Sequence, residues 1–116
     1  MNFKTADERN PLELNELSEL LGDPYNSMIK FTIDVELEKA VFGGEMHADS
    51  ELILLKNGSL QKNIWGANLY PERERSIWLE YTSLINIRPT QDNLSMEILS
   101  VDLQNTIALI INKIIK

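Results

Sequence analysis

The stretch from Ile29 to Leu37 constrains the fold more than any other part of the chain, because apolar residues occupy every second position. Successive side chains of a β-strand point to opposite faces of the sheet, so this period predicts a strand with one buried and one solvated face. Such a strand must bury its apolar face against other elements. The apolar positions are Ile29, Phe31, Ile33, Val35 and Leu37, and they alternate with Lys30, Thr32, Asp34 and Glu36.

Two segments with helical spacing flank the centre of the chain. Asn10 and Pro11 suit the N-cap and first position of a helix that ends at Gly22. Near the C-terminus, Ser100 or Asp102 can cap a second helix. We interpret its apolar stripe as a core-facing surface, although three more apolar residues widen the stripe enough to touch another subunit. The stripe is Leu103, Ile107, Ile110, Ile111 and Ile114, widened by Ala108, Leu109 and Ile115.

Four or five strands are expected between these helices. Gly43-Gly44 marks a turn or bulge, after which a second strand runs to about Lys56. Asn57-Gly58 predicts a two-residue hairpin turn, because both residues tolerate positive φ. A third strand then ends near Leu69, a charged connection spans residues 70–75, and a long fourth strand covers 76–88. A short fifth strand follows at 95–99.

These elements predict one α+β domain over residues 10–116, preceded by a polar tail at 1–9. We expect an N-terminal helix, a four- to five-stranded, mainly antiparallel meander sheet and a C-terminal helix. Both helices are expected to pack on one face of the sheet.

Composition excludes several classes of function. With 18 acidic and 11 basic residues the net charge is −7, which disfavours sequence-independent nucleic-acid binding and favours a cation, a basic protein or a neutral small molecule. The chain has no cysteine, so disulfides and thiolate chemistry are absent. Neither a secretory signal nor a membrane span is visible, and we expect a cytoplasmic protein that binds neither membrane nor nucleic acid.

The stretch GGEMHADSE contains the only histidine and is the first candidate site. On a strand, Glu45, His47 and Asp49 would share one face, and the predicted hairpin would place Asn68 opposite His47. Carboxylates and imidazole are ligands for zinc, iron or manganese, so a divalent metal is one hypothesis. Side chains about 7 Å apart fan out along a strand, however, and any solvated sheet face shows the same alternation.

Three more residues are candidates for ligand binding. Trp65 beside Gly66 could form an aromatic wall with open space next to it, or it could belong to the core. Asn86 and Arg88 alternate on the fourth strand and could hold a carboxylate or phosphate. Pairing of Arg88 with an acidic residue of the protein itself is the competing interpretation. The chain shows no Ser-His-Asp arrangement and no phosphate-binding glycine loop.

The ordered motifs GGEMHADSE, LLKNGS, IWGAN, SLINIRP and N-L-SMEI resemble a family of short prokaryotic proteins known only as a domain of unknown function. The resemblance covers about residues 28–99. It implies that the matching positions belong together, and it implies no activity, cofactor or partner. These positions are Gly43, Gly44, Glu45, His47, Ala48, Asp49, Gly58, Ser59, Trp65, Gly66, Asn86, Arg88, Pro89, Asn93, Ser95, Met96 and Glu97.

Three functional hypotheses follow from the sequence. The leading one is a small cytosolic binding or regulatory module, acting as a homodimer, with a polar recognition patch formed by Glu45, His47, Asp49, Asn68 and Arg88. The alternative is a small metal-dependent enzyme, such as a hydrolase, that holds its cation with the first three of these residues. The third hypothesis is a subunit of a larger assembly.

Overall fold

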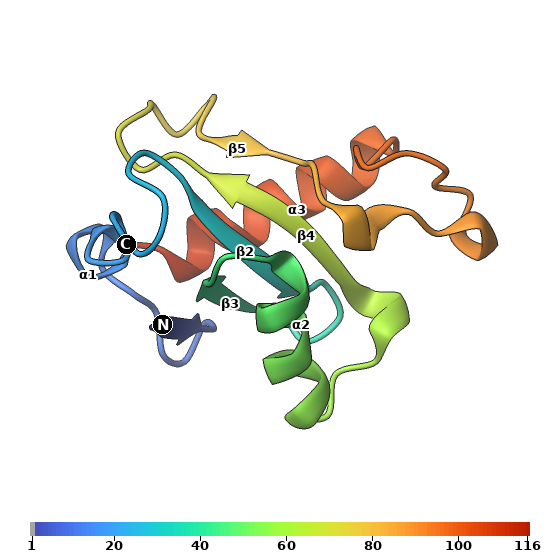
Figure 1. Ribbon diagram of the computed structural model, residues 1–116, viewed down its shortest axis with the longest axis horizontal. Helices are drawn as coiled ribbons and strands as arrows, with labels where there is room; N and C mark the ends of the chain where they lie inside the picture. The colour runs from blue at the N-terminus through green and yellow to red at the C-terminus, as the bar shows by residue number, and fades with distance from the viewer. Residues whose placement is uncertain (1) are drawn as a thin grey trace.

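A five-stranded antiparallel sheet organises the fold in the computed structural model, which describes residues 2–116 (Figure 1). The strands are β1 (Phe3–Ala6), β2 (Ile29–Asp34), β3 (Lys39–Gly43), β4 (Ile64–Leu69) and β5 (Leu79–Glu80), and the α-helices are α1 (Leu14–Ser18), α2 (His47–Lys56) and α3 (Val101–Ile114). The prediction of an α+β fold is therefore confirmed. The meander is wrong, because the spatial order is β1-β3-β2-β4-β5 and β4 pairs with β2 rather than β3.

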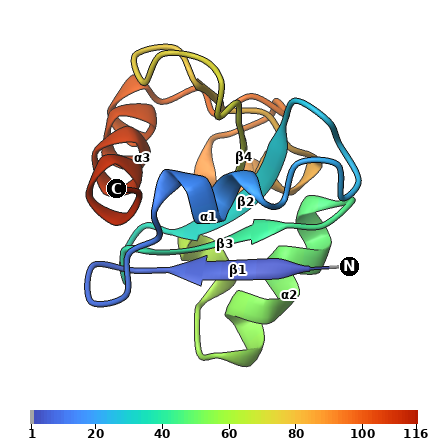
Figure 2. The same ribbon diagram turned by 90° about the vertical axis from the view of Figure 1, so that its left-hand side faces the viewer.

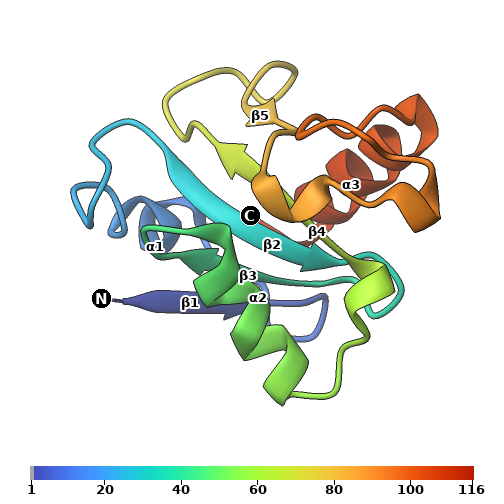
Figure 3. The same cartoon turned by 45° about the vertical axis from the view of Figure 1, so that its right-hand side comes forward.

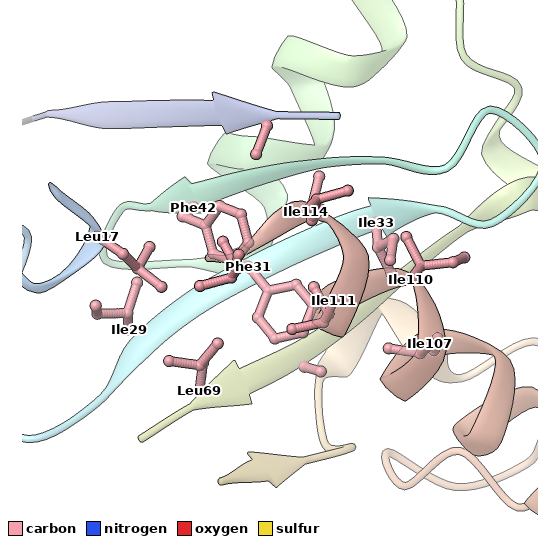
Figure 4. Packing of buried hydrophobic residues seen from close by; sticks show 14 of the residues in the cluster. Leu17, Ile29, Phe31, Ile33, Phe42, Leu69, Ile107, Ile110, Ile111 and Ile114 are labelled. Atoms are coloured by element: carbon pink, nitrogen blue, oxygen red, sulfur yellow. The ribbon is translucent and has the colours of Figure 1, made fainter. Parts of the chain in front are cut away.

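The helices lie on both faces of the sheet, not on one face as predicted. Figure 2 shows α1 and α3 on one side and α2 on the other. The larger hydrophobic cluster lies on the α3 side, where Phe31 of β2 packs among side chains of α3 such as Ile111 (Figure 4). Ile29, Phe31 and Ile33 are all buried there, so the predicted apolar face of β2 is confirmed, whereas the predicted solvated face is wrong.

The opposite face of β2 is also buried, because α2 covers it. Thr32 and Asp34 are fully buried on this face, and Thr32 Oγ1 donates to Ser50 Oγ of α2 at 3.1 Å. Asp34 Oδ1 accepts the backbone N–H groups of Glu36 and Leu37, each at 2.9 Å. This side-chain turn ends the strand at Asp34, whereas the alternation predicted a longer strand.

The N-terminal residues differ from the polar tail predicted for 1–9. Within the described part, β1 pairs with β3, with Lys4 opposite Phe42. The helix predicted to begin at Asn10 starts later and is shorter: α1 begins at Leu14, and Glu13 and Glu16 form its capping box. Residues 3–6 therefore form an edge strand of the sheet where a polar tail was predicted.

Residues 47–56 form a helix where a second strand was predicted. The buried residues His47, Ser50, Glu51 and Leu54 recur at the spacing of a helical face. Asn57-Gly58 ends this helix instead of turning a hairpin. Gly58 has a φ of +99°, its N–H donates to Leu55 O at 3.2 Å, and the next N–H donates to Leu54 O at 3.0 Å. These bonds define a Schellman C-cap, which needs positive φ as a hairpin turn does.

The segment after β4 contains less strand than predicted. Only Leu79–Glu80 pairs with β4, and residues 81–99 form loops with two short 3₁₀ turns, Leu84–Asn86 and Pro89–Gln91. Figure 3 shows this orange segment beside β4 and α3. The C-terminal helix is confirmed, and Ser100 is its N-cap, with Oγ accepting from Leu103 N at 3.1 Å.

Candidate functional site

A pocket of about 380 Å³ opens where the N-terminal end of α2 meets β2, β4, β5 and the loop after β5. Sheet register brings its polar floor together, because Asn68 of β4 lies between Lys30 of β2 and Glu80 of β5. Directly opposed residues point their side chains to the same face. The polar lining is Lys30, His47, Asn68, Glu80, Thr82 and Ser83, and the apolar lining is Met28, Met46, Ala48, Leu84, Ile85 and Met96.

His47 is the first residue of α2 and is buried against β4. Its Nε2 lies 2.8 Å from the carbonyl oxygen of Ala67. A carbonyl oxygen only accepts, so Nε2 carries the hydrogen, and in the neutral ring Nδ1 is an acceptor. Burial lowers the pKa of His47 more than its contacts with Ala67 and Asn68 raise it, and Lys30 lowers it further. The imidazole is therefore neutral at pH 7.

The amide of Asn68 is held in a fixed orientation in the same wall. Its Nδ2 donates to Glu80 Oε1 at 2.9 Å and to the carbonyl oxygen of Thr82 at 3.5 Å. Turning the amide over would set Oδ1 against these two acceptors, so the hydrogen bonds fix its orientation. Asn68 is only 6% exposed, and its Oδ1 accepts no hydrogen bond from the residues that the structure describes. A buried polar atom without a partner costs free energy.

Methionines make up half of the apolar lining of this pocket. The chain has four methionines, and Met28, Met46 and Met96 line it. Leu84 and Met46 are more than half exposed at the same place. Methionine side chains are flexible and polarizable, so they adapt to apolar groups of different shapes.

Arg88 is buried, and its side chain binds backbone carbonyl groups of other residues in the protein. Its guanidinium donates to the carbonyl oxygens of Ile85 at 3.0 Å, Gln61 at 2.6 Å and Ile64. The same group stacks 4.6 Å from the ring centroid of Trp65, which is itself 5% exposed. Trp65 and Arg88 therefore support the fold beneath the loops. Neither lines the pocket that contains His47.

Arg88 and Glu51 line a separate hollow of about 420 Å³. Glu51 Oε2 is 3.8 Å from Arg88 Nη2, which is too long for a hydrogen bond. Burial raises the pKa of the Glu51 carboxyl, and the nearby Arg88 opposes that rise. The expectation that Arg88 pairs with an acid of the protein itself thus agrees with this geometry.

Asn86 replaces a missing strand partner for β4. Its Oδ1 accepts from Gly66 N and its Nδ2 donates to Gly66 O, both at 2.9 Å. A Cβ at Gly66 would lie 2.7 Å from Ser83 Cβ, so only glycine lets the loop approach this closely. Asn93 Nδ2 then donates to the carbonyl oxygens of Asn86 and Glu97, at 2.7 and 3.0 Å. Asn86 and Asn93 therefore hold the loop that forms one wall of the pocket.

Glu45 and Asp49 lie at the start of α2, outside the pocket. Both are exposed, and Asp49 Oδ2 accepts from the backbone N–H of Met46 at 3.4 Å, as a capping residue does. Helical geometry turns Asp49 away from the buried side of His47. Within residues 2–116, no three histidine, aspartate or glutamate side chains gather closely enough to hold a metal ion. The metal hypothesis therefore gains no geometric support from these residues.

Comparison with known proteins identifies the family of this chain. A family model described as "Protein of unknown function (DUF5674)" matches residues 8–114. The chain belongs to this family. No curated protein and no solved structure gave a match. The resemblance to an uncharacterised family is thereby confirmed at the level of the family, and its function is unknown. Across residues 2–116, no helix is long and apolar enough to cross a membrane.

Of the seven residues predicted for a site, His47 and Asn68 line the pocket. Sequence reasoning missed Lys30, Glu80 and Thr82, which the sheet register brings to the same floor. It also missed the methionines, which are far apart in sequence. Had β2 been paired with β4, the polar row Lys30-Asn68-Glu80 would have been visible as one face of neighbouring strands.

Proposed function

We propose that this protein is a small cytosolic binding module and that its ligand enters the pocket between α2, β4 and the loop after β5. The observation that carries the proposal is the buried polar wall formed by His47 and Asn68 beneath a methionine-rich rim. Binding pockets typically combine apolar walls with a few oriented polar groups. This pocket has both features, and its Asn68 Oδ1 has no partner among the described residues.

The polar groups of the pocket are held in place by the surrounding structure. The Ala67 carbonyl orients the imidazole of His47, and Glu80 orients the amide of Asn68. A site whose polar atoms are already oriented loses less freedom when a ligand binds. The exposed rim residues can move, since methionine chains change rotamer easily. A rigid floor under an adaptable rim suits recognition of a small molecule or of one side chain of a partner.

Methionine-methyl NMR tests this proposal with 1-hexanol as an aliphatic probe. We expect saturable shifts of the Met28, Met46 and Met96 methyl signals on titration. Ala48 lines the pocket from α2, so Ala48→Phe should fill the space and abolish these shifts. Lys56→Phe adds the same ring at the other end of α2, away from the pocket, and should leave them unchanged. Shifts that do not saturate, or that survive Ala48→Phe, would contradict the proposal.

The metal-dependent enzyme is the alternative, and it can be tested by measuring the melting temperature with and without metal. Protein purified without an affinity tag should show no zinc- or manganese-induced rise in melting temperature that depends on His47. A rise lost in His47→Gln would favour the alternative over the binding module.

A further inference from the structure

The floor of the pocket carries two opposite charges that do not pair with each other. Lys30 lies opposite Asn68, and Asn68 lies opposite Glu80, so the three side chains form one row on the same face of β2, β4 and β5 (Figure 1). Neighbouring strands are about 4.8 Å apart, which places the Cα atoms of Lys30 and Glu80 about 10 Å apart. Both residues line the pocket, and neither forms an ion pair with the residues that the structure describes.

A separate contact holds each of these charges on its own side of the row. Lys30 Nζ lies 5.4 Å from the centroid of the Tyr25 ring. Glu80 Oε1 accepts from Asn68 Nδ2 at 2.9 Å and from the Tyr70 hydroxyl at 3.4 Å. Glu80 is exposed and Lys30 is half-buried, so both side chains are accessible from the pocket. The pocket therefore has a cation on one side and an anion on the other.

Neighbouring groups extend this separation of charge. Glu97 is exposed and lies opposite Thr82 in an isolated antiparallel bridge, so a second carboxylate stands on the side of Glu80. On the other side, Lys30 is joined by the N-terminal end of α2, whose partial positive charge Asp49 offsets in part. The pocket is therefore positive toward β2 and α2 and negative toward β5.

We propose that the pocket binds an aliphatic α-amino acid as a zwitterion, with its ammonium toward Glu80 and its carboxylate toward Lys30. Such a ligand has both charges at one end and an apolar chain at the other, which matches a charged floor beneath a methionine rim. A ligand with a single charge would leave the opposite charge of the floor without a partner. The inference rests on the proposed function, since it assigns a ligand class to the same pocket.

The apolar chain of the ligand is expected to contact the methionines. Met46 and Met96 are 54% and 42% exposed at the rim, and Met28 lines the same pocket. An aliphatic chain that covers them removes apolar surface of both partners from water. Because methionine adapts to different shapes, the rim accepts aliphatic chains in general. The two charges of the floor then decide which head group is preferred.

A series of six-carbon probes tests the class on the intact wild-type chain. L-Norleucine carries both charges at one end, hexanoate and hexylammonium carry one each, and 1-hexanol carries none. Titrations at about pH 7, followed by the methionine methyl signals, give a Kd for each probe. We expect norleucine to bind about tenfold more tightly than hexanoate or hexylammonium, because it gains a second charged partner. It should also bind more tightly than 1-hexanol.

The pattern of affinities separates this inference from the proposed function. If hexanoate, hexylammonium or 1-hexanol binds as tightly as norleucine, the zwitterion is overturned while the binding pocket stands. 6-Aminohexanoate has the same two charges at opposite ends of its chain, and tightest binding of this probe would contradict the placement of both charges on the floor. Absence of saturable binding by every probe would overturn the binding module itself.

Two variants assign the charges to their sides of the pocket. Lys30→Gln should weaken the binding of norleucine and hexanoate about tenfold and leave hexylammonium unchanged. Glu80→Gln keeps an oxygen acceptor for Asn68 Nδ2, and it should weaken norleucine and hexylammonium while leaving hexanoate unchanged. The opposite assignment, or loss of the same probes in both variants, would contradict the proposed orientation.

Lys56→Gln and Glu72→Gln are the matched controls, because they make the same charge changes at exposed positions outside the pocket. Both should leave the Kd of every probe unchanged. Effects as large as those of the pocket variants would show that the net charge of the chain attracts the probes, which would overturn the inference. The wild-type series decides the ligand class even where a variant fails to fold.

Discussion

The two faces of the sheet achieve burial with different chemistry. Toward α3 the contacts are apolar, with Phe31 and Ile33 of β2 against Ile107 and Ile111. Toward α2 the same strand presents Thr32 and Asp34, which are buried through hydrogen bonds. Apolar burial is not directional and tolerates repacking, while a buried polar group needs a partner at a defined position. The α3 face thus supplies stability, and the α2 face fixes where side chains lie.

Ile111→Ala should show the largest loss of stability, because it removes apolar volume from the α3 face. Ile111 is fully buried, and such truncations cost about 2–5 kcal/mol in free energy of unfolding. Urea denaturation measures the change. Leu109→Ala on the same helix is the control, since Leu109 is 66% exposed and should cost little. Equal losses in the two variants would mean that α3 does not pack as described.

Asn86→Ala tests whether a single side chain replaces a strand partner on the other face. The change leaves the N–H and carbonyl groups of Gly66 without their partners, and each buried unsatisfied group costs about 1–3 kcal/mol. We expect a loss of free energy of unfolding of about 3 kcal/mol in urea denaturation. Asn105→Ala, at an exposed position of α3, is the matched control and should be neutral or slightly stabilising. A neutral Asn86→Ala would show that the loop is held by other contacts.

Gly66→Ala should destabilise the protein by about 1–3 kcal/mol through a clash with the loop. Its new Cβ would lie 2.7 Å from both Cβ and Oγ of Ser83. Introducing Ser83→Gly into the same chain should recover part of the loss, and a double-mutant cycle of melting curves measures that coupling.

The comparison for Gly66 is Gly58→Ala, which acts by a different mechanism. Gly58 has a φ of +99° and open space around it, so alanine there costs backbone strain of about 1–2 kcal/mol. Ser83→Gly should give no recovery in this case. Recovery at both positions, or at neither, would refute the proposed contact between Ser83 and β4.

Sequence reasoning succeeded where one apolar period dominated. The stripe of α3 predicts a helix at this position, and Ser100, one of the two N-caps considered from the sequence, caps it. The alternation of β2 likewise identified its buried positions on the α3 side. Both cases depend on local periodicity, which the sequence carries directly.

The same reasoning failed at α2 because two periods coincide there. Glu45, His47 and Asp49 alternate as on a strand, while His47, Ser50 and Leu54 follow a helical face. Asn57-Gly58 did not decide between them, since a hairpin turn and a helix C-cap both require positive φ at glycine. Asp49 in the first turn and Lys56 in the last turn were helix signals of the kind that complements the helix dipole.

The loop over residues 81–99 could not be predicted for a different reason. Its conformation depends on buried polar residues such as Asn86, Arg88 and Asn93, which residue type alone would place at the surface. Their partners are backbone groups far away in sequence, for example Gly66 and Gln61. The sequence did suggest that His47 and Asn68 lie near each other, but through a hairpin that does not form. They meet instead where a helix packs on a strand.

The smallest expected effect concerns the charge of His47 on the polar face. Burial lowers its pKa below the usual 6.5, so between the two values the unfolded chain binds more protons than the folded chain. The free energy of unfolding should hold above about pH 6.5 and decrease as pH falls below it. This histidine contributes at most about 1.4 kcal/mol per pH unit within that window. The difference in free energy of unfolding between wild type and His47→Gln, measured across this pH range, isolates the contribution of His47 from that of Glu51. The raised pKa of Glu51 changes stability in the opposite direction.

Because the chain has one histidine, its imidazole NMR signal gives the pKa of His47 directly. A value at or above 6.5 would mean that burial does not dominate the surroundings of the ring, and the polar face would then be more open than the structure shows.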